Sequence, residues 1–149
     1  MKIKEVLKNK GYKIFLIKPD VLLFDAVEKF SKKNVGALIV VNKNKELKGI
    51  ISEKDVIKKI YNTKCQIKNI KIKDIMTGYK DMIIAHQRDS IEYAMDIMTK
   101  NKIRHLPILG KKNNLKGIIS MGDIIYSLIK EKDHENKMLK DYINGIYQM

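Results

Sequence analysis

The sequence has no tryptophan, only one cysteine and no long apolar run. The single cysteine, Cys65, cannot form a disulfide within the chain, which agrees with a reducing compartment such as the cytoplasm. The longest unbroken apolar run comprises residues 37–41, whereas a membrane-spanning helix needs about 20 such residues. Residues 1–5 also lack the apolar stretch of a secretory signal. We therefore expect a cytoplasmic protein without a membrane span.

Aromatic residues are scarce as well, at 7% of the 149 residues, whereas hydrophobic residues of all kinds make up 44%. This hydrophobic content is sufficient for a true core, and it excludes a chain that is disordered throughout. The scarcity of large rings means that the core must be mainly aliphatic. The length suits one ordinary domain, or two small repeats that share a core.

Acidic residues are few compared with basic ones, 17 against 31, and the net charge is +14. Such a charge can indicate binding to nucleic acid or to an anionic membrane surface. However, Arg88 and Arg104 are the only arginines, and the lysines are spread over the chain rather than gathered in one block. Abundant lysine, isoleucine and asparagine favour the compositional bias of an AT-rich genome. A nucleic-acid-associated protein remains the alternative interpretation.

The chain contains a tandem repeat. The string Leu-Lys-Gly-Ile-Ile-Ser occurs at residues 47–52 and again at residues 115–120, which is an offset of 68 residues. An aspartate follows three residues after the serine in both copies, as Asp55 and Asp123. The match continues outward without a gap, and it reaches the N-terminus once the offset grows by one residue. The sequence therefore predicts two copies of one supersecondary unit.

Hydrophobic periodicity predicts that each unit is built as β-α-β-β-α. The predicted elements of the first unit are a strand over 12–17, a helix capped by Asp20, strands over 37–41 and 47–51, and a helix capped by Ser52. Those of the second unit are a strand over 81–85, a helix capped by Ser90, strands over 106–109 and 115–119, and a helix capped by Ser120. Pro107 predicts that its strand lies at a sheet edge or that the strand begins there.

Shorter segments complete the predicted organisation. Residues 1–11 and 71–76 have the pattern of short helices. Residues 130–137 are polar on every face, so they form either a solvent-exposed stretch of the last helix or a break in it. The predicted division of the chain is a first repeat over 1–70, a second repeat over 71–130 and a C-terminal helical tail over 131–149.

Both repeats have the pattern Ser-x-x-Asp where a strand meets a helix. One interpretation is a capping box, in which the serine and the acid satisfy free N–H groups of the helix end. The other is a nucleotide site, because a helix N-terminus attracts phosphate and a carboxylate one turn further on can accept from two ribose hydroxyls. The recurrence of the pattern after Gly-Ile-Ile favours the nucleotide site, and Gly122 would leave room for a ligand. No metal-ligand spacing, P-loop or nucleophile elbow is present, so we expect neither a metal nor a catalytic site.

Five strings taken together resemble the CBS domain, the cystathionine-β-synthase-type regulatory repeat; they are residues 35–41, 49–55, 72–77, 103–108 and 117–123. The resemblance covers essentially the whole chain. It implies an α+β fold in which two βαββα repeats pack through their sheets about a pseudo-twofold axis. It also implies clefts between the repeats that hold an adenosine ligand, with AMP, ADP or ATP as first choice and NAD(H) or S-adenosylmethionine as the others.

The resemblance further implies roles for single residues. Asp55 and Asp123 would bind the ribose hydroxyls. The residues implied around the phosphates are Ser52, Ser120, Lys54, Arg104, His105 and Gly122. The residues whose backbone would hold the adenine are Ile17, Lys18, Ile39, Ala85, His86 and Pro107. The first repeat has Gly36-Ala37 where the second has Arg104-His105, so we expect two chemically different clefts.

These observations predict a regulatory module that senses energy or redox state through an adenosine nucleotide. It would act on a separately encoded enzyme or transporter, or through its own homodimer, which the apolar helix faces and residues 142–147 suggest. The alternative is a basic nucleic-acid-associated protein that uses the CBS pair as a scaffold, with nucleic acid the less expected partner. Enzymes such as inosine monophosphate dehydrogenase carry CBS pairs as inserts, but this length leaves no room for a catalytic domain, so we expect no enzyme.

Overall fold

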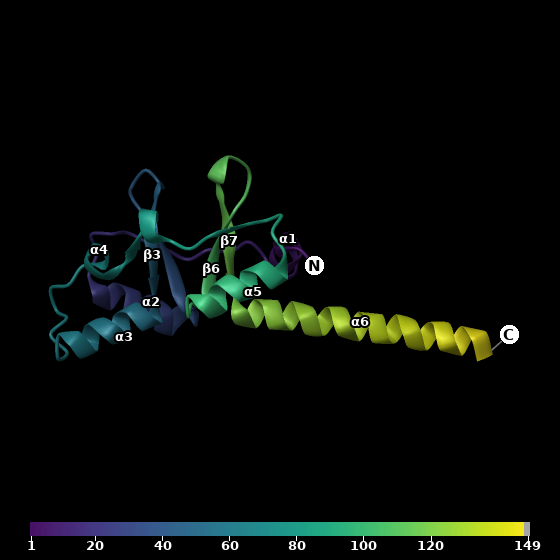
Figure 1. Ribbon diagram of the computed structural model, residues 1–149. Helices are drawn as coiled ribbons and strands as arrows, with labels where there is room; N and C mark the ends of the chain where they lie inside the picture. The colour runs from purple at the N-terminus through teal and green to yellow at the C-terminus, as the bar shows by residue number, and fades with distance from the viewer. Residues whose placement is uncertain (148–149) are drawn as a thin grey trace.

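The computed structural model describes the backbone of residues 1–147 and the side chains of residues 1–145, and it contains two small β-sheets with flanking helices (Figure 1). The first sheet has the strand order β1-β2-β3-β4, with β1 (Leu16–Ile17), β2 (Ala37–Val41), β3 (Leu47–Ser52) and β4 (Thr77–Gly78). The second has the order β5-β6-β7, with β5 (Ala85–His86), β6 (His105–Leu109) and β7 (Leu115–Ser120). The α-helices are α1 (Ile3–Lys10), α2 (Leu23–Lys33), α3 (Glu53–Asn62), α4 (Ile72–Ile75), α5 (Ile91–Lys100) and α6 (Met121–Tyr147), and the short 3-10 helices are η1 (Tyr79–Asp81) and η2 (Lys111–Asn113).

The repeat seen in the sequence is a repeat of structure. In both sheets a short parallel edge strand pairs with the central strand, β1 with β2 and β5 with β6. Each central strand then forms an antiparallel hairpin, β2 with β3 and β6 with β7, and the register of both hairpins shifts at the same equivalent position. The α+β architecture of two tandem repeats is confirmed.

Three aliphatic clusters hold the molecule together. The first repeat has a core around Leu23, Leu38 and Ile51, and the second has a matching core around Leu106 and Ile119. A third cluster, in which Ile39, Val41 and Ile118 are buried, lies between the two sheets. The two repeats therefore pack through their sheets, as expected, and no aromatic residue belongs to the fully buried set among the described residues.

The short helices α1 and α4 are exchanged between the repeats. Helix α1 precedes the first repeat, but its buried residues Ile3, Val6 and Leu7 belong to the core of the second repeat, beside β7 (Figure 1). Helix α4 precedes the second repeat, but Ile72 belongs to the core of the first. The exchange buries the apolar face of each helix in the core of the other repeat.

Backbone hydrogen bonds fix the two exchanged helices in the same way. The Ile3 N–H donates to the carbonyl of Asp89 at 2.9 Å, and the Ile72 N–H donates to the carbonyl of Val21 at 3.0 Å. An isolated β-bridge accompanies each contact, Lys2 with Ser90 and Leu22 with Lys71. The division into 1–70, 71–130 and 131–149 remains our proposal for the domain boundaries, although the two cores cross it.

The first strand of each repeat is shorter than predicted. The predictions of strands over 12–17 and 81–85 were wrong in their bounds, because only β1 and β5, two residues each, pair with the central strand. Before β1, the side chain of Phe15 packs against the first core and that of Ile14 against the cluster between the sheets, and of these two residues only Phe15 bonds to β2, through its carbonyl. An apolar run thus predicted burial correctly but not strand pairing.

The prediction that Asp20 caps α2 was wrong. The helix begins at Leu23, and the Leu22 N–H donates to the carboxylate of Asp25 at 3.1 Å. Asp20 instead forms an ion pair with Lys73, 3.1 Å between Oδ1 and Nζ. The serine caps were predicted correctly: Ser52, Ser90 and Ser120 each accept from a backbone N–H of the first helical turn.

Pro107 lies in the middle of a central strand, so the prediction of an edge or a strand start was wrong. The reason lies in the lost N–H group. In the first repeat the equivalent Ile39 N–H points toward the edge strand and donates to Phe15 at 3.0 Å. In the second repeat Pro107 has no N–H group to make this bond, and β5 pairs only from Ile108 onward, one residue later than β1.

Helix α6 is continuous through residues 130–137, which form an exposed stretch rather than a break. Its second half extends away from the rest of the molecule (Figure 1). No helix in the described part of the chain, α6 included, is both long and apolar enough to cross a membrane.

Alanine substitutions at the equivalent glycines of the two hairpins, Gly49 and Gly117, test this architecture. A Cβ at Gly49 would collide with the backbone carbonyl oxygen of Thr77 in β4, whereas a Cβ at Gly117 would lie 2.8 Å from the flexible end of Leu7. We expect Gly49→Ala to lower the free energy of unfolding by about 2–3 kcal/mol and Gly117→Ala by about 1 kcal/mol or less. Urea unfolding measures both values. Equal losses would contradict the pairing of β4 with the first sheet.

Candidate functional site

The two Ser-x-x-Asp patterns form capping boxes with nearly the same geometry. The Ser52 N–H donates to Asp55 Oδ2 at 2.8 Å, and the Ser120 N–H donates to Asp123 Oδ2 at 2.7 Å. In return, each serine Oγ accepts from the aspartate N–H, at 3.4 Å in the first repeat and 3.1 Å in the second. These bonds use Oδ2 of each carboxylate, so Oδ1 is free of the cap. The capping interpretation and a ligand role are therefore compatible.

A cleft of about 910 Å³ lies between the repeats beside the first of these boxes. Six residues that were predicted for ligand binding line it: Ser52, Lys54 and Asp55 from the first repeat, and Arg104, His105 and Pro107 from the second. The chain positions of these two groups are far apart, and the sheet-to-sheet packing brings them together. A ligand in this cleft would contact both repeats at once.

The cleft also contains charged residues that the sequence analysis did not single out. They are Lys58, Lys102, Glu53 and Asp81. Lys58 could have been found, because it lies four residues after Lys54 and therefore on the same face of α3. Lys102 could not, because its position depends on the packing of the second repeat against the first, where its carbonyl accepts from Lys54 Nζ at 3.4 Å.

His105 lies at the centre of the contact between the repeats. A Cβ at Gly36 would be 2.7 Å from His105 Cε1 and 2.8 Å from Glu53 Oε1, so a side chain here would force the imidazole or the Glu53 carboxylate to move. Burial lowers the pKa of His105, and the positive charges of Lys10 and Arg104 lower it further against the opposing charges of Glu53 and Asp123. The imidazole is therefore neutral at pH 7, and hydrogen bonding rather than charge is what it offers a phosphate.

Asp123 has a different environment from its counterpart Asp55. Lys10 Nζ of helix α1 lies 2.8 Å from Asp123 Oδ2, and it also donates to the carbonyl of Ile118. Burial opposes ionisation of Asp123, but the hydrogen bonds from Lys10 and Ser120 and the charge of Lys10 outweigh it, so the pKa of Asp123 lies below its ordinary value. Asp123 and Ser120 do not line the cleft described above. The exchanged helix therefore places a cation of the protein beside the second predicted ribose ligand.

The remaining predicted residues lie apart from one another. Ile17 and Lys18 lie at the end of β1, and Ile39 is buried between the sheets. Ala85 and His86 form β5, on the far side of β6 from β7. Gly122 is exposed, and a Cβ there would meet nothing closer than 3.6 Å. Of the six predicted adenine contacts, only Pro107 lines the cleft. Neither residue of β5 lines it, but Ile83, which precedes β5, does.

Side chains that could ligate a metal are dispersed. Within the residues that the structure describes, no three His, Cys, Asp or Glu side chains are placed to share a metal ion. The one cysteine, Cys65, is exposed in the turn after α3.

Comparison with known proteins identifies relatives of this architecture. The mitochondrial CBS domain-containing protein CBSX3 of Arabidopsis thaliana is 34% identical over 151 residues, which cover 97% of this chain and 73% of that protein. The crystal structure of the CBS-domain containing protein ATU1752 from Agrobacterium tumefaciens matches with a TM-score of 0.80 and 26% identity, over 85% of this chain and 98% of the other.

Two more distant structures share the fold and contain ligands. The CBS domain pair of MJ0100, in complex with 5′-methylthioadenosine and S-adenosylmethionine, matches with a TM-score of 0.72 and 23% identity over 86% of this chain and 99% of its own. CBSX2 in complex with AMP matches with a TM-score of 0.69 and 21% identity, over 88% of this chain and 98% of the CBSX2 chain. The family model of the CBS domain matches residues 3–62 and again residues 72–130. The chain therefore belongs to the CBS-domain family and consists of a tandem pair of these domains.

Proposed function

We propose that the protein is a regulatory module, not an enzyme, that binds an adenosine nucleotide in the cleft lined by Asp55. The observation that carries this proposal is the convergence of a carboxylate, a hydroxyl and several cations from both repeats on one cleft. The adenosine ligands of MJ0100 and CBSX2 support the same class of ligand. AMP, ADP and ATP are the first candidates, and NAD(H) and S-adenosylmethionine are the others.

Each side chain of the cleft has a role in this proposal. Asp55 accepts hydrogen bonds from the ribose hydroxyls through Oδ1, while Oδ2 continues to cap α3. Lys54 and Arg104 bind the phosphate from opposite walls of the cleft, where the guanidinium offers two parallel donors. Ser52 and neutral His105 add donors without adding charge. Pro107 contributes its backbone carbonyl, which needs no N–H group to contact an adenine amine.

The regulatory step follows from the position of the cleft between the repeats. A ligand that contacts both walls binds best to one mutual orientation of the repeats. It shifts their equilibrium by the difference between its affinities for the two orientations. A separately encoded enzyme or transporter would sense that orientation. The exposed thiol of Cys65 agrees with a reducing compartment, and we propose the cytoplasm.

A single ligand per chain is part of the proposal. Asp55 is not paired with a cation in the described structure, whereas Asp123 is paired with Lys10. A ribose at Asp123 would have to displace this ion pair and the bond from Lys10 to Ile118. The predicted roles of Asp123, Ser120 and Gly122 therefore apply only to a chain in which Lys10 has moved.

A homodimer through α6 is the other part of the proposal. Met138, Leu139, Tyr142 and Ile143 of its projecting half are 41–68% exposed. Leu139 and Ile143 are one helical turn apart, so their side chains form a stripe that a second copy of the helix can cover. The side chains of Ile146 and Tyr147, which were also predicted to take part, lie outside the described residues.

Thermal unfolding with AMP, ADP, ATP, NAD, NADH and S-adenosylmethionine tests the ligand site. A ligand at about 100 times its dissociation constant should raise the melting temperature by about 5–10 °C, since it stabilises the fold by about 2.7 kcal/mol. We expect Asp55→Ala to abolish this shift and Asp123→Ala to preserve it, each measured against its own ligand-free baseline. Each variant loses an equivalent helix cap, Asp55→Ala that of α3 and Asp123→Ala that of α6, so each controls for the loss of the cap in the other; Asp123→Ala also loses the ion pair with Lys10. A shift that depends on Asp123 alone would contradict the assignment of the cleft.

Urea unfolding of Lys10→Gln at two pH values tests the ion pair with Asp123. Because folding lowers the pKa of Asp123, its ionised form stabilises the fold above the ordinary carboxyl range near pH 4, and this contribution is lost as the pH falls through the folded-state pKa. We expect Lys10→Gln to cost about 1 kcal/mol at pH 7 and much less at pH 3. Lys8→Gln, on the exposed side of the same helix, is the control. A cost that does not change with pH would contradict the ion pair.

Light scattering at micromolar concentration tests the dimer. We expect a dimer for the wild type and a monomer for the double variant Leu139→Glu, Ile143→Glu, because four carboxylates would face one another in the helix pair. The double variant His134→Glu, Asn144→Glu places the same residue type on the opposite face of α6 and should remain dimeric. A monomeric wild type would overturn this part of the proposal.

A further inference from the structure

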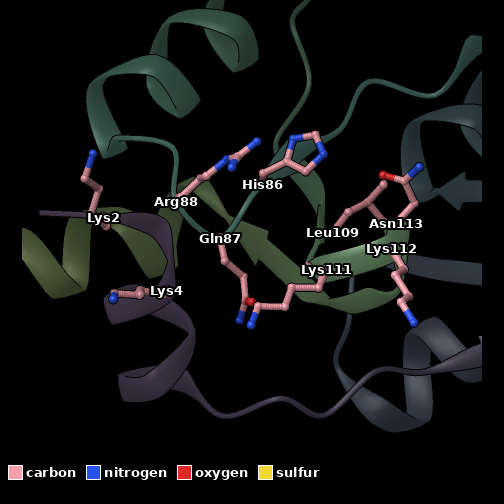
Figure 2. Close-up of a pocket in the computed structure, with 10 residues that line it drawn as sticks. Lys2, Lys4, His86, Gln87, Arg88, Leu109, Lys111, Lys112 and Asn113 are labelled. Atoms are coloured by element: carbon pink, nitrogen blue, oxygen red, sulfur yellow. The ribbon is translucent and has the colours of Figure 1, made fainter.

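A second hollow, of about 780 Å³, lies on the second repeat away from the Asp55 cleft (Figure 2). Three segments form it: the start of α1, the loop between β5 and α5, and the tip of the β6–β7 hairpin. Its lining includes five permanently cationic side chains, Lys2, Lys4, Arg88, Lys111 and Lys112. No aspartate or glutamate is among the described residues that line it. The hollow is therefore strongly electropositive.

The acidic residues nearest in sequence to the lining cations already accept hydrogen bonds from the backbone. Asp89 Oδ2 accepts from the His86 N–H at 2.8 Å, and Glu5 Oε2 accepts from the Lys2 N–H at 3.2 Å. Backbone bonds also hold the walls in place, because the Lys4 N–H donates to the carbonyl of Gln87 at 3.0 Å. The cations are thus presented by a fixed frame, and the first amides of α1 are not available to a ligand.

The first repeat provides an internal comparison. Lys73 occupies the position of Lys4, since its N–H donates to the carbonyl of Pro19 as that of Lys4 does to Gln87. In the first repeat Lys73 pairs with Asp20, 3.1 Å between charged atoms. In the second repeat the position of Asp20 is occupied by Arg88. An ion pair of one repeat is therefore replaced by two cationic residues in the other, so within the described residues Lys4 lacks the internal counter-charge that Lys73 has.

The lining also limits the kind of anion. A nucleoside needs a partner for its ribose hydroxyls, but the described lining has no carboxylate to accept from them, and its one aromatic ring is the small imidazole of His86. Leu109 is its one large apolar residue, and it is buried. Lysine and arginine side chains suit phosphate oxygens. Five of them around a concave surface match several linked phosphates better than one.

We propose that this hollow is an anion site for a short condensed phosphate, separate from the nucleotide cleft. Lys4 and Arg88 would bind one end of the phosphate chain, and Lys111 and Lys112 of the hairpin tip would bind the other. Lys111 and Lys112 line the hollow from the hairpin tip, where Lys112 has a left-handed backbone conformation with φ of 55°.

Isothermal titration calorimetry with inorganic tripolyphosphate tests the site on the full chain at about 0.1 M salt. We expect binding that Arg88→Asp weakens by about tenfold or more, because this change introduces the residue that the first repeat has at the equivalent position. Because the first repeat folds with an aspartate at this position, we expect Arg88→Asp to fold as well. Its melting temperature without anion checks this. Lys43→Asp makes the same charge change on the hairpin of the first repeat, and it should alter affinity less than about twofold.

Two further measurements, together with the comparison of Arg88→Asp and Lys43→Asp, distinguish this site from the nucleotide cleft, from a nucleic-acid site and from general attraction to a basic surface. Asp55→Ala should leave tripolyphosphate binding unchanged, so the anion site can fail or succeed independently of the nucleotide cleft. Equal weakening by Arg88→Asp and Lys43→Asp, or no binding at all, would overturn the proposal. A single-stranded RNA that binds more tightly than tripolyphosphate and depends equally on Arg88 would also overturn it, in favour of nucleic acid.

Discussion

The reciprocal docking of α1 on the second repeat and of α4 on the first is the contact on which the rest of the structure depends. It completes both aliphatic cores, since Ile3, Val6 and Leu7 are fully buried in one and Ile72 in the other. It ties each repeat to the other beside the cluster between the sheets, where the packing of the repeats leaves the cleft. Finally, it places Lys10 beside Asp123, so one packing arrangement determines both where a ligand has room and where a protein cation takes its place.

Equivalent positions of the two repeats have acquired different tasks within this common frame. Gly36 is small where Arg104 is large, and this allows His105 to cross from the second repeat toward Glu53 of the first. Asp20 pairs with Lys73, whereas Arg88 and Lys4 both line an electropositive hollow. Because the two repeats share one fold, the fold itself does not explain why equivalent positions carry different residues. Such differences therefore point to separate functions of the two repeats.

The sequence predicted what is local and repetitive. Both hairpins, the three serine caps and the short helices were read from hydrophobic periodicity and from capping chemistry, and the structure confirms them. The exchange of α1 and α4 could not be predicted, because an amphipathic helix shows which face is buried but not which repeat covers it. The same limit applies to Lys10, whose partner lies in the far half of the chain. The prediction for Pro107 failed because a proline removes only one ladder bond, that of its own N–H group. The short strand β5 does not reach the position where this bond would form, so a central strand can contain the proline.

The exchange also bears on how such a chain could arise. A single copy of the repeat would carry a leading helix whose groove exists only on another copy, so two separate copies would have to associate with their helices swapped. The tandem chain has the form of that dimer after fusion of its two genes, with residues 63–71 as the joint. Fusion turns a concentration-dependent association into an intramolecular one. It also frees each half to change by itself, which a symmetric pair of identical subunits can never do.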